Sequence, residues 1–327
     1  MCHLIYTDTF YMKRKWIRWV SWILLTPIIL FVILMVLLYV PPVQNLLRRE
    51  VTAYASKATG MQIQVERIDL RFPLNLLVRG VEVIQQPDTL LSLESLNVRV
   101  QAWPLIKGKV EVDEVTLSRV AVNSADLMEG MKIKGVLGRF FLQSHGVDLS
   151  NELAVINQVE LSDTHVQLLM NDTTTTPKDT TASAPINWKV ALHQLKLKNV
   201  SFSMQLPADS MRMAAHIGEE AIYDAQADLK NQYYDLKKFL LSGTSASYDT
   251  GTAQPAEGFD ASHIAVRDIR IALDSLLYKG RDMNAVIREF TMNERSGLSV
   301  TSLTGRAYSN DSVICVPGLK LNTPHSE

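Results

Sequence analysis

The stretch KVEVDEVTLSRVAVN, residues 109–123, decides the fold. Its apolar residues come in alternating pairs separated by steps of three: Val110 and Val112, Val115 and Leu117, and Val120 and Val122. Alternation with a period of two is typical of a β-strand with one apolar face. In a regular strand, a step of three would move the next pair to the opposite face. The pattern therefore predicts that a β-bulge absorbs the extra residue, or that a turn ends one strand and begins another.

The same step recurs in most of the chain after Gly60. It is found in MQIQVERIDLRF (61–72), LLSLESLNVRV (90–100), AVINQVELSDTHVQL (154–168), VALHQLKLKNVSF (190–202) and IAVRDIRIAL (264–273). The fourth segment contributes Leu195 and Leu197. The intervals between these segments are irregular, which excludes a solenoid of fixed period. The recurrence predicts a single twisted β unit that is used repeatedly.

Other segments are less regular. GEEAIYDAQADLKNQYYDLKKFLL has the composition of a helix, but Leu236, Phe239 and Leu241 keep the three-then-two spacing. We therefore predict a strand over Tyr233–Tyr248 and leave residues 218–229 open between helix and strand. Residues 171–187, rich in Thr and containing two prolines, are predicted to be a disordered loop or excursion.

A membrane anchor is predicted over residues 12–41. No charged residue occurs from Ile23 to Val40, and eighteen residues at about 1.5 Å each span about 27 Å, close to the bilayer core. The flanking residues predict a cytoplasmic N-terminus and an aromatic belt; they are Lys13, Arg14, Lys15 and Arg18, and Trp16, Trp19 and Trp22. The alternative, a cleaved signal peptide, would have a shorter apolar run and a cleavage site of small residues. Residues 1–11 are interpreted as a non-structural extension.

A short amphipathic helix is predicted over residues 42–60. Val43, Leu47, Val51 and Tyr54 recur at steps of three and four, and Gly60 suits a C-terminal helix cap. Two roles remain open for this helix. It could cap the first strand of the sheet, or it could lie at the membrane surface.

Composition argues against several functions. The net charge is −1, so no overall positive charge recruits nucleic acid. The two cysteines and seven histidines are well separated and match no metal or catalytic motif. We therefore expect a protein that is not an enzyme, with no catalytic residues, no metal site and no cofactor.

The apolar faces of the strands need a partner, because few helices are predicted to cover them. Two sheets could pack against each other as a β-sandwich. Alternatively, one open, curved sheet would leave an apolar groove able to hold acyl chains. The candidate groove-lining residues are Val110, Val112, Val115, Leu117, Val120, Val122, Leu195 and Leu197.

The order of features from residue 12 to about 123 narrows this choice. A basic start and one anchor are followed by PPVQNLLRREVTAYASKATG (41–60) and MQIQVERIDLRFPLNLLVRGVEV (61–83). Then comes VRVQAWPLIKGKVEVDEVTLSRVAVN (98–123), in which Pro104, Leu105, Gly108 and Lys109 precede paired strands. This order resembles the AsmA-like family, and most of all the N-terminal part of its TamB-type translocation and assembly module proteins. Such proteins are far longer and end in a β domain not found in these residues, so a truncated chain is expected.

The resemblance implies a mainly β fold: a transmembrane helix and a short amphipathic helix, then an elongated, taco-shaped antiparallel groove over residues 61–327. It implies an inner-membrane protein with its bulk in the periplasm, and it supplies no catalytic residues. The expected function is to shield phospholipid acyl chains during transport toward the outer membrane. The first alternative is a scaffold for the assembly or secretion of outer-membrane β proteins, with a β-barrel assembly protein as partner. The second is a membrane-tethered β-sandwich binding module.

Overall fold

The computed structural model describes Thr26, Val36 and residues 39–72, 74–101, 103–104, 111–124, 130–148, 151–171 and 187–326. The elements are α2 (Pro41–Thr59), β1 (Gln62–Arg71), β2 (Asn75–Gln85), β3 (Asp88–Val100), β4 (Val112–Asn123), β5 (Met131–Asp148), β6 (Leu153–Met170), β7 (Lys189–Leu206), the 3₁₀ turn η1 (Pro207–Asp209), β8 (Met211–Asp228), β9 (Tyr233–Asp249), β10 (His263–Lys279), β11 (Asp282–Glu294), β12 (Ser299–Val300), β13 (Ser302–Ser309), β14 (Ile314–Cys315) and β15 (Lys320–Asn322).

The predicted extension and most of the predicted anchor, residues 1–38 apart from Thr26 and Val36, lie outside the described residues. Among the residues that are described, no helix is long and apolar enough to cross a membrane.

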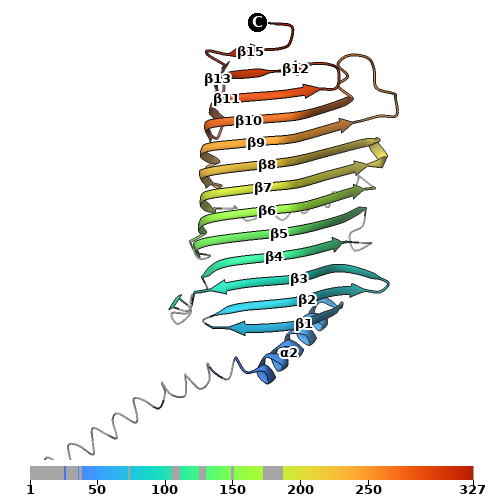
Figure 1. Cartoon of the computed structure of the whole chain (residues 1–327), viewed down its shortest axis with the longest axis vertical. Coiled ribbons are helices and arrows are strands. Elements are labelled where there is room, and N and C mark those ends of the chain that lie inside the picture. Colours follow the sequence, from blue (N-terminus) through green and yellow to red (C-terminus); the bar gives the residue numbers. More distant parts are fainter. Residues whose placement is uncertain are drawn as a thin grey trace, which may run out of the picture.

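The strands form one open sheet in which consecutive strands lie side by side along the long axis of the molecule (Figure 1). Every main pair is antiparallel except β6 and β7, which run parallel, with Ala154 opposite Val190 and Val166 opposite Phe202. The predicted antiparallel sheet is therefore wrong at this one pair. Parallel neighbours require a connection that returns from one end of the strands to the other, and residues 171–188 lie between β6 and β7 in the chain. This connection contains the predicted loop, of which residues 172–186 lie outside the described residues.

The segment left open between helix and strand is a strand. Residues 218–228 belong to β8, which pairs along its whole length with β7 and β9. Its Ala and Glu residues favour a helix locally, but two neighbouring strands satisfy its backbone on both sides, and tertiary context overrides propensity. The strand predicted over Tyr233–Tyr248 is present as β9.

The three-residue steps have a common structural cause, a line of kinks that crosses the sheet. We call this line the first seam; its residues are Glu66, Gly80, Glu94, Arg119, Gly138, Asp163, Asn199, Gly218 and Gly243 in β1 to β9. Each lies opposite the next, and pairing continues in the same register on both sides of it. Arg119, Asp163, Asn199 and the two glycines Gly80 and Gly243 have positive φ, between 46° and 59°.

The expectation of bulges or turns is thus wrong at the first seam in β1–β9. It holds for the step from Val112 to Val115, where the pairing of β3 with β4 has a register shift between Arg99 and Val100. A single residue in the left-handed region reverses the alternation without adding a residue to only one strand, so neither strand loses register. Asn, Asp and Gly adopt this conformation most readily, and four of the five positive-φ positions carry them. In β10 the equivalent residue, Asp268, does lie at a true register shift.

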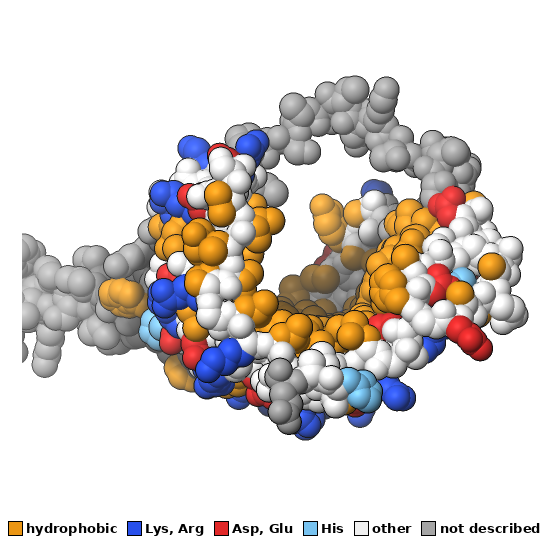
Figure 2. Space-filling view, turned by 90° about the horizontal axis from the view of Figure 1, so that it is seen from above, with side chains coloured by type: hydrophobic (Ala, Val, Ile, Leu, Met, Phe, Trp, Pro, Cys, Tyr) orange, Lys and Arg blue, Asp and Glu red, His pale blue; other side chains and the backbone are white. Residues whose placement is uncertain are grey.

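A second seam runs parallel to the first, six residues away along the strands. In β6–β9 it consists of Asn157, His193, Asp224 and Lys237, where pairing is again interrupted without a change of register. Each of these strands is therefore divided into a wall, a five-residue floor and a second wall. Viewed along the long axis, the sheet is a trough with a hydrophobic interior (Figure 2).

Helix α2 covers the free edge of β1 (Figure 1). Its side chains bond to the unpaired backbone groups of that edge: Gln44 Nε2 donates to Leu70 O at 2.9 Å, and Arg48 Nη1 donates to Val65 O at 3.2 Å. Ser56 Oγ accepts a hydrogen bond from Ile63 N at 3.1 Å. The helix ends at Gly60, which has φ 69°. The predicted capping role is therefore observed, and it protects an edge that could otherwise pair with another strand.

The sheet encloses no closed core. The described part of the chain contains no completely buried side chain, and only seven apolar residues are classed as buried. A sandwich would bury the inner faces of two packed sheets. The described strands instead belong to one open sheet, so the sandwich alternative is not the architecture they form.

Candidate apolar groove

The floor of the trough carries one uninterrupted apolar row across eleven neighbouring strands. Each member lies directly opposite the next in the strand register; the row consists of Leu70, Leu76, Val98, Val115, Leu142, Val159, Leu195, Ile222, Phe239, Leu273 and Ile287. Directly opposed residues on one face of a sheet have Cβ atoms about 5 Å apart. The side chains therefore form a continuous apolar strip, which we call the first floor row.

A second floor row runs beside the first, two residues closer to the first seam. Its members are Ile68, Val78, Leu96, Leu117, Phe140, Leu161, Leu197, Glu220, Leu241 and Ile271. Glu220 is the exception, because it lies between Leu197 of β7 and Leu241 of β9. Burial raises the pKa of the Glu220 carboxyl above its ordinary value. Within the described residues no ion pair or hydrogen bond holds this carboxylate.

The outer face of the same strands is polar. Arg79, Ser95, Ser118, Arg139, Ser162, Lys198, Glu219 and Ser242 form one complete row across β2–β9. Ion pairs join adjacent strands on this face. Arg99 of β3 pairs with Glu114 of β4 at 3.2 Å, and the first-seam residues Glu94 of β3 and Arg119 of β4 pair with each other. In Figure 2 the charged side chains gather on the outside of the trough and the hydrophobic ones on the inside. Since side chains alternate between faces, the apolar rows face the groove.

The walls continue the apolar lining beyond each seam. On one wall, Val122, Val166, Phe202 and Ala215 lie in register. On the other wall, an apolar hollow of about 160 Å³ is lined by residues of β7–β10 that include Leu192, Ala225, Leu236 and Leu276. The rim of this second wall carries Tyr234 and Tyr278, whose ring centroids are 5.9 Å apart.

The residues predicted to line the groove lie in different parts of the trough. Val115, Leu117, Leu195 and Leu197 lie in the two floor rows. Val120 and Val122 follow the first seam and lie on a wall, while Val112 is the first residue of β4, opposite Val100. Val110 lies outside the described residues, and so do all seven residues proposed to orient the anchor, Lys13, Arg14, Lys15, Trp16, Arg18, Trp19 and Trp22.

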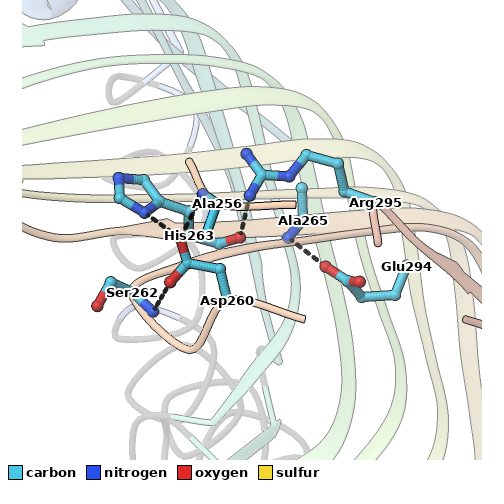
Figure 3. Close-up of polar contacts among 7 residues, drawn as sticks. All are labelled: Ala256, Asp260, Ser262, His263, Ala265, Glu294 and Arg295. Carbon is cyan, nitrogen blue, oxygen red and sulfur yellow. Dashed lines mark hydrogen bonds and ion pairs between the residues drawn. The ribbon is translucent and has the colours of Figure 1, made fainter. Parts of the chain in front are cut away.

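A polar cluster fixes the end of the wall formed by β10 and β11 (Figure 3). Asp260 accepts hydrogen bonds from Ala256 N at 3.0 Å and Ser262 N at 2.9 Å, and it lies 2.9 Å from Nδ1 of His263. These donors lower the pKa of Asp260 to about 2. Arg295 Nη2 donates to His263 O at 2.9 Å. Because the Asp260 carboxylate, His263 and Arg295 are bonded to one another and to nearby backbone groups, we interpret the cluster as a structural clamp.

Sequence reasoning missed Glu220 and most seam residues. Glu220 lies in the segment whose composition suggested a helix, so its position in a strand row was not visible. The seam did have a sequence signal, since each positive-φ residue directly precedes a β-branched residue: a valine after Gly80, Arg119 and Asn199, and a threonine after Asp163 and Gly243. An Asp, Asn or Gly at that place in a three-residue step indicates the left-handed conformation.

The groove has the features of a surface for apolar ligands. Across the described ranges no group of three His, Cys, Asp or Glu side chains is placed to hold a metal ion. Comparison with models of known protein families and with curated protein sequences gives no match.

Proposed function

We propose that this protein is anchored in the inner membrane and shields phospholipid acyl chains in its periplasmic β groove during transport toward the outer membrane. The observation that supports the proposal most directly is the first floor row, which is apolar in all eleven strands that it crosses. Ten strand spacings of about 4.8 Å give a strip of about 48 Å. That length exceeds the bilayer core of about 30 Å, so the strip can accommodate whole acyl chains.

The mechanism is passive and follows from the two faces of the sheet. Each CH₂ group kept from water is worth about 0.8 kcal/mol, so an acyl chain outside a bilayer needs a continuous apolar cover. The first floor row provides that cover, and the open mouth of the trough leaves a polar headgroup in water. Because the row has no gap between Leu70 and Ile287, a chain can move along it without crossing a polar barrier. Deep isolated pockets would instead retain the lipid.

Site-specific photocrosslinking tests this proposal. A photoreactive residue is placed in the full chain at Leu195 or Leu197, in membranes of phosphatidylethanolamine and phosphatidylglycerol. The matched controls are Lys196 and Lys198, which alternate with them on the outer face of β7. We expect phospholipid adducts at the two leucine positions and at least several-fold fewer at the two lysine positions. Equal capture on both faces would contradict the proposal, and capture of unfolded β-barrel chains in place of phospholipid would favour the assembly scaffold.

A further inference from the structure

Helix α2 makes its side-chain hydrogen bonds to the sheet from one polar stripe. Gln44, Arg48 and Ser56 lie four or eight residues apart and make the hydrogen bonds to β1. The apolar residues Leu47, Val51 and Tyr54 form a different stripe, which is centred about 105° away from the polar one at 100° per residue. Leu47 and Val51 are exposed, and Tyr54 is 77% exposed. The apolar stripe of α2 is thus unpartnered within the described residues.

Two exposed aromatic residues lie at the edge of the sheet where α2 begins. Gln44, in the first turn of α2, bonds to Leu70, so that turn lies near the end of β1. Phe72 follows β1 directly and is 85% exposed, and Trp103 follows the end of β3 and is 69% exposed. The C-terminal ends of β1 and β3 lie on the same side of the sheet. Val100, the last residue of β3, donates its N–H to O of Leu74, in the turn that follows β1, at 3.0 Å. We call Leu46, Leu47, Val51, Tyr54, Phe72 and Trp103 together the α2 corner.

The chemistry of the α2 corner fits the interface of a bilayer better than a protein partner. Aromatic residues are enriched where the apolar core meets the headgroups, and an amphipathic helix lies in that layer with its apolar stripe inward. Arg49 and Arg71 are exposed, and no ion pair holds either of them among the described residues. Free arginines beside an apolar surface suit phospholipid phosphates.

The position of α2 in the chain identifies which bilayer this is. The uncharged run Ile23–Val40 ends at the residue before α2, so no linker separates the predicted anchor from the helix. If that run spans the membrane, α2 emerges at its surface. The residues Leu46 to Tyr54 then follow the end of the anchor by about two to four helical turns.

We propose that the α2 corner rests on the surface of the inner membrane and holds the β1 end of the groove against it. This inference rests on the anchor and groove of the proposed function and adds the point at which the groove meets the bilayer. The first floor row begins at Leu70, beside Phe72, so acyl chains leaving the outer leaflet would reach the apolar strip without crossing water. The helix would therefore both cover the free edge of β1 and hold the sheet against the membrane.

The test uses the full chain in nanodiscs of phosphatidylethanolamine and phosphatidylglycerol. A photoreactive residue is placed singly at Leu47, Val51 or Phe72, and as a control at Glu257, which lies in the loop between β9 and β10. We expect phospholipid adducts at the first three positions and none at Glu257. In parallel, a donor dye on Asp88 reports energy transfer to a lipid-bound acceptor, and the double variant Leu47→Glu/Val51→Glu should lower that transfer at least twofold. Asn45→Glu, which adds a charge elsewhere on the helix, should leave it unchanged.

The outcomes separate this inference from the proposed function. Adducts at Leu195 without adducts at Leu47, Val51 and Phe72 would overturn the seating of α2 while leaving the groove intact. Adducts at Leu47, Val51 and Phe72 without adducts at Leu195 would support the contact of α2 with the membrane and contradict lipid binding in the groove. Crosslinks from the α2 corner to a second copy of the chain would show that the face is a protein interface and would overturn the inference. Unchanged energy transfer in the double variant would do the same.

Discussion

The groove face and the outer face of this sheet are made by alternate residues of the same strands, yet they follow different rules. Along β7, Leu195 and Leu197 face the groove, whereas Gln194, Lys196 and Lys198 face outward. The outer face changes its polar residues freely and joins strands through ion pairs. The groove face keeps apolar side chains in every strand of the first floor row. The two faces therefore differ in what they can contact: the groove face offers a continuous apolar surface, and the outer face does not.

The seams explain how strands of up to 18 residues can bend and still keep one apolar and one polar face. A straight strand keeps its faces but cannot bend into a trough. A left-handed residue bends the strand and shifts its alternation by one. The sequence compensates with a step of three at the same place, so Leu197 and Val200 both face inward on either side of Asn199. Shape and apolar lining therefore depend on the same few residues.

The largest effect is expected from a charge on the floor. Leu195→Asp removes apolar contact and places an unpaired carboxylate between Val159 and Ile222, which should cost about 2–4 kcal/mol of unfolding free energy. The matched change Gln194→Asp, one residue away on the outer face, should cost less than about 1 kcal/mol. Urea denaturation of both variants measures the difference. Equal losses would mean that the two faces do not differ as described.

The next effect concerns the close packing of strands at the first seam. A Cβ atom on Gly138 would lie 2.7 Å from Cβ of Asp163, whereas one on Gly135, in the adjacent wall, would lie 3.4 Å from its nearest neighbour. Gly138→Ala should therefore destabilise the protein by about 1–3 kcal/mol, as overpacking does. Gly135→Ala should change the stability by about 0.5 kcal/mol or less. If thermal unfolding ranks the two variants the other way, the seam is not the tight point of the sheet.

A smaller effect is expected at the polar clamp, where acid should weaken the wall. The pKa of Asp260 is lowered from 3.8 to about 2, so the folded state favours the ionised carboxylate. The resulting stabilisation is complete above about pH 4 and is lost as the pH falls toward 2. Asp260→Asn removes this contribution, so the gap in stability between the variant and the natural protein should narrow as the pH falls from 5 to 2.5. A gap that stays constant over this range would show that the ionised Asp260 does not support the wall.

The smallest effect is expected at Glu220, with the opposite dependence on pH. Its pKa is raised by burial, so the stability of the folded state is highest below the ordinary pKa of a glutamate and falls as the pH rises through the raised value. Glu220→Gln should therefore become modestly more stable than the natural protein toward neutral pH. Glu219→Gln, which removes a charge from the outer face of the same strand, is the control. The same pH-dependent gain in both variants would argue against a special position for Glu220 on the floor.

Much of the lining could be predicted from local patterns. The pairing of Val115 with Leu117, and of Leu195 with Leu197, was visible because alternation records which face a residue takes. The helix after Pro41 was visible from its periodicity and from Gly60. The direction of β7 was not, because the register of two strands depends on contacts between distant residues such as Val159 and Leu195. Nor was β8, whose helix-favouring residues are held in the sheet by neighbours on both sides.

The two roles left open for α2 could not be separated by sequence, since periodicity gives an apolar stripe but not its partner. The structure shows that the polar stripe, with Gln44 and Arg48, is the one that contacts β1. The mechanism of the seam was also beyond the pattern. A step of three is compatible with a bulge, a turn or a left-handed residue, and only the continuous register across Arg119 distinguishes them.

The central claim is that the first seam keeps one apolar face turned toward the groove, and a lipid-crosslinking scan through β4 tests it most directly. Single photoreactive residues are placed from Val115 to Val122 in the full chain in phospholipid membranes. The account predicts adducts at Val115, Leu117, Val120 and Val122, with a step of three across Arg119, and few at Thr116, Ser118 and Ala121. A strict period of two through the whole strand, with adducts at Val115, Leu117, Arg119 and Ala121, would contradict it.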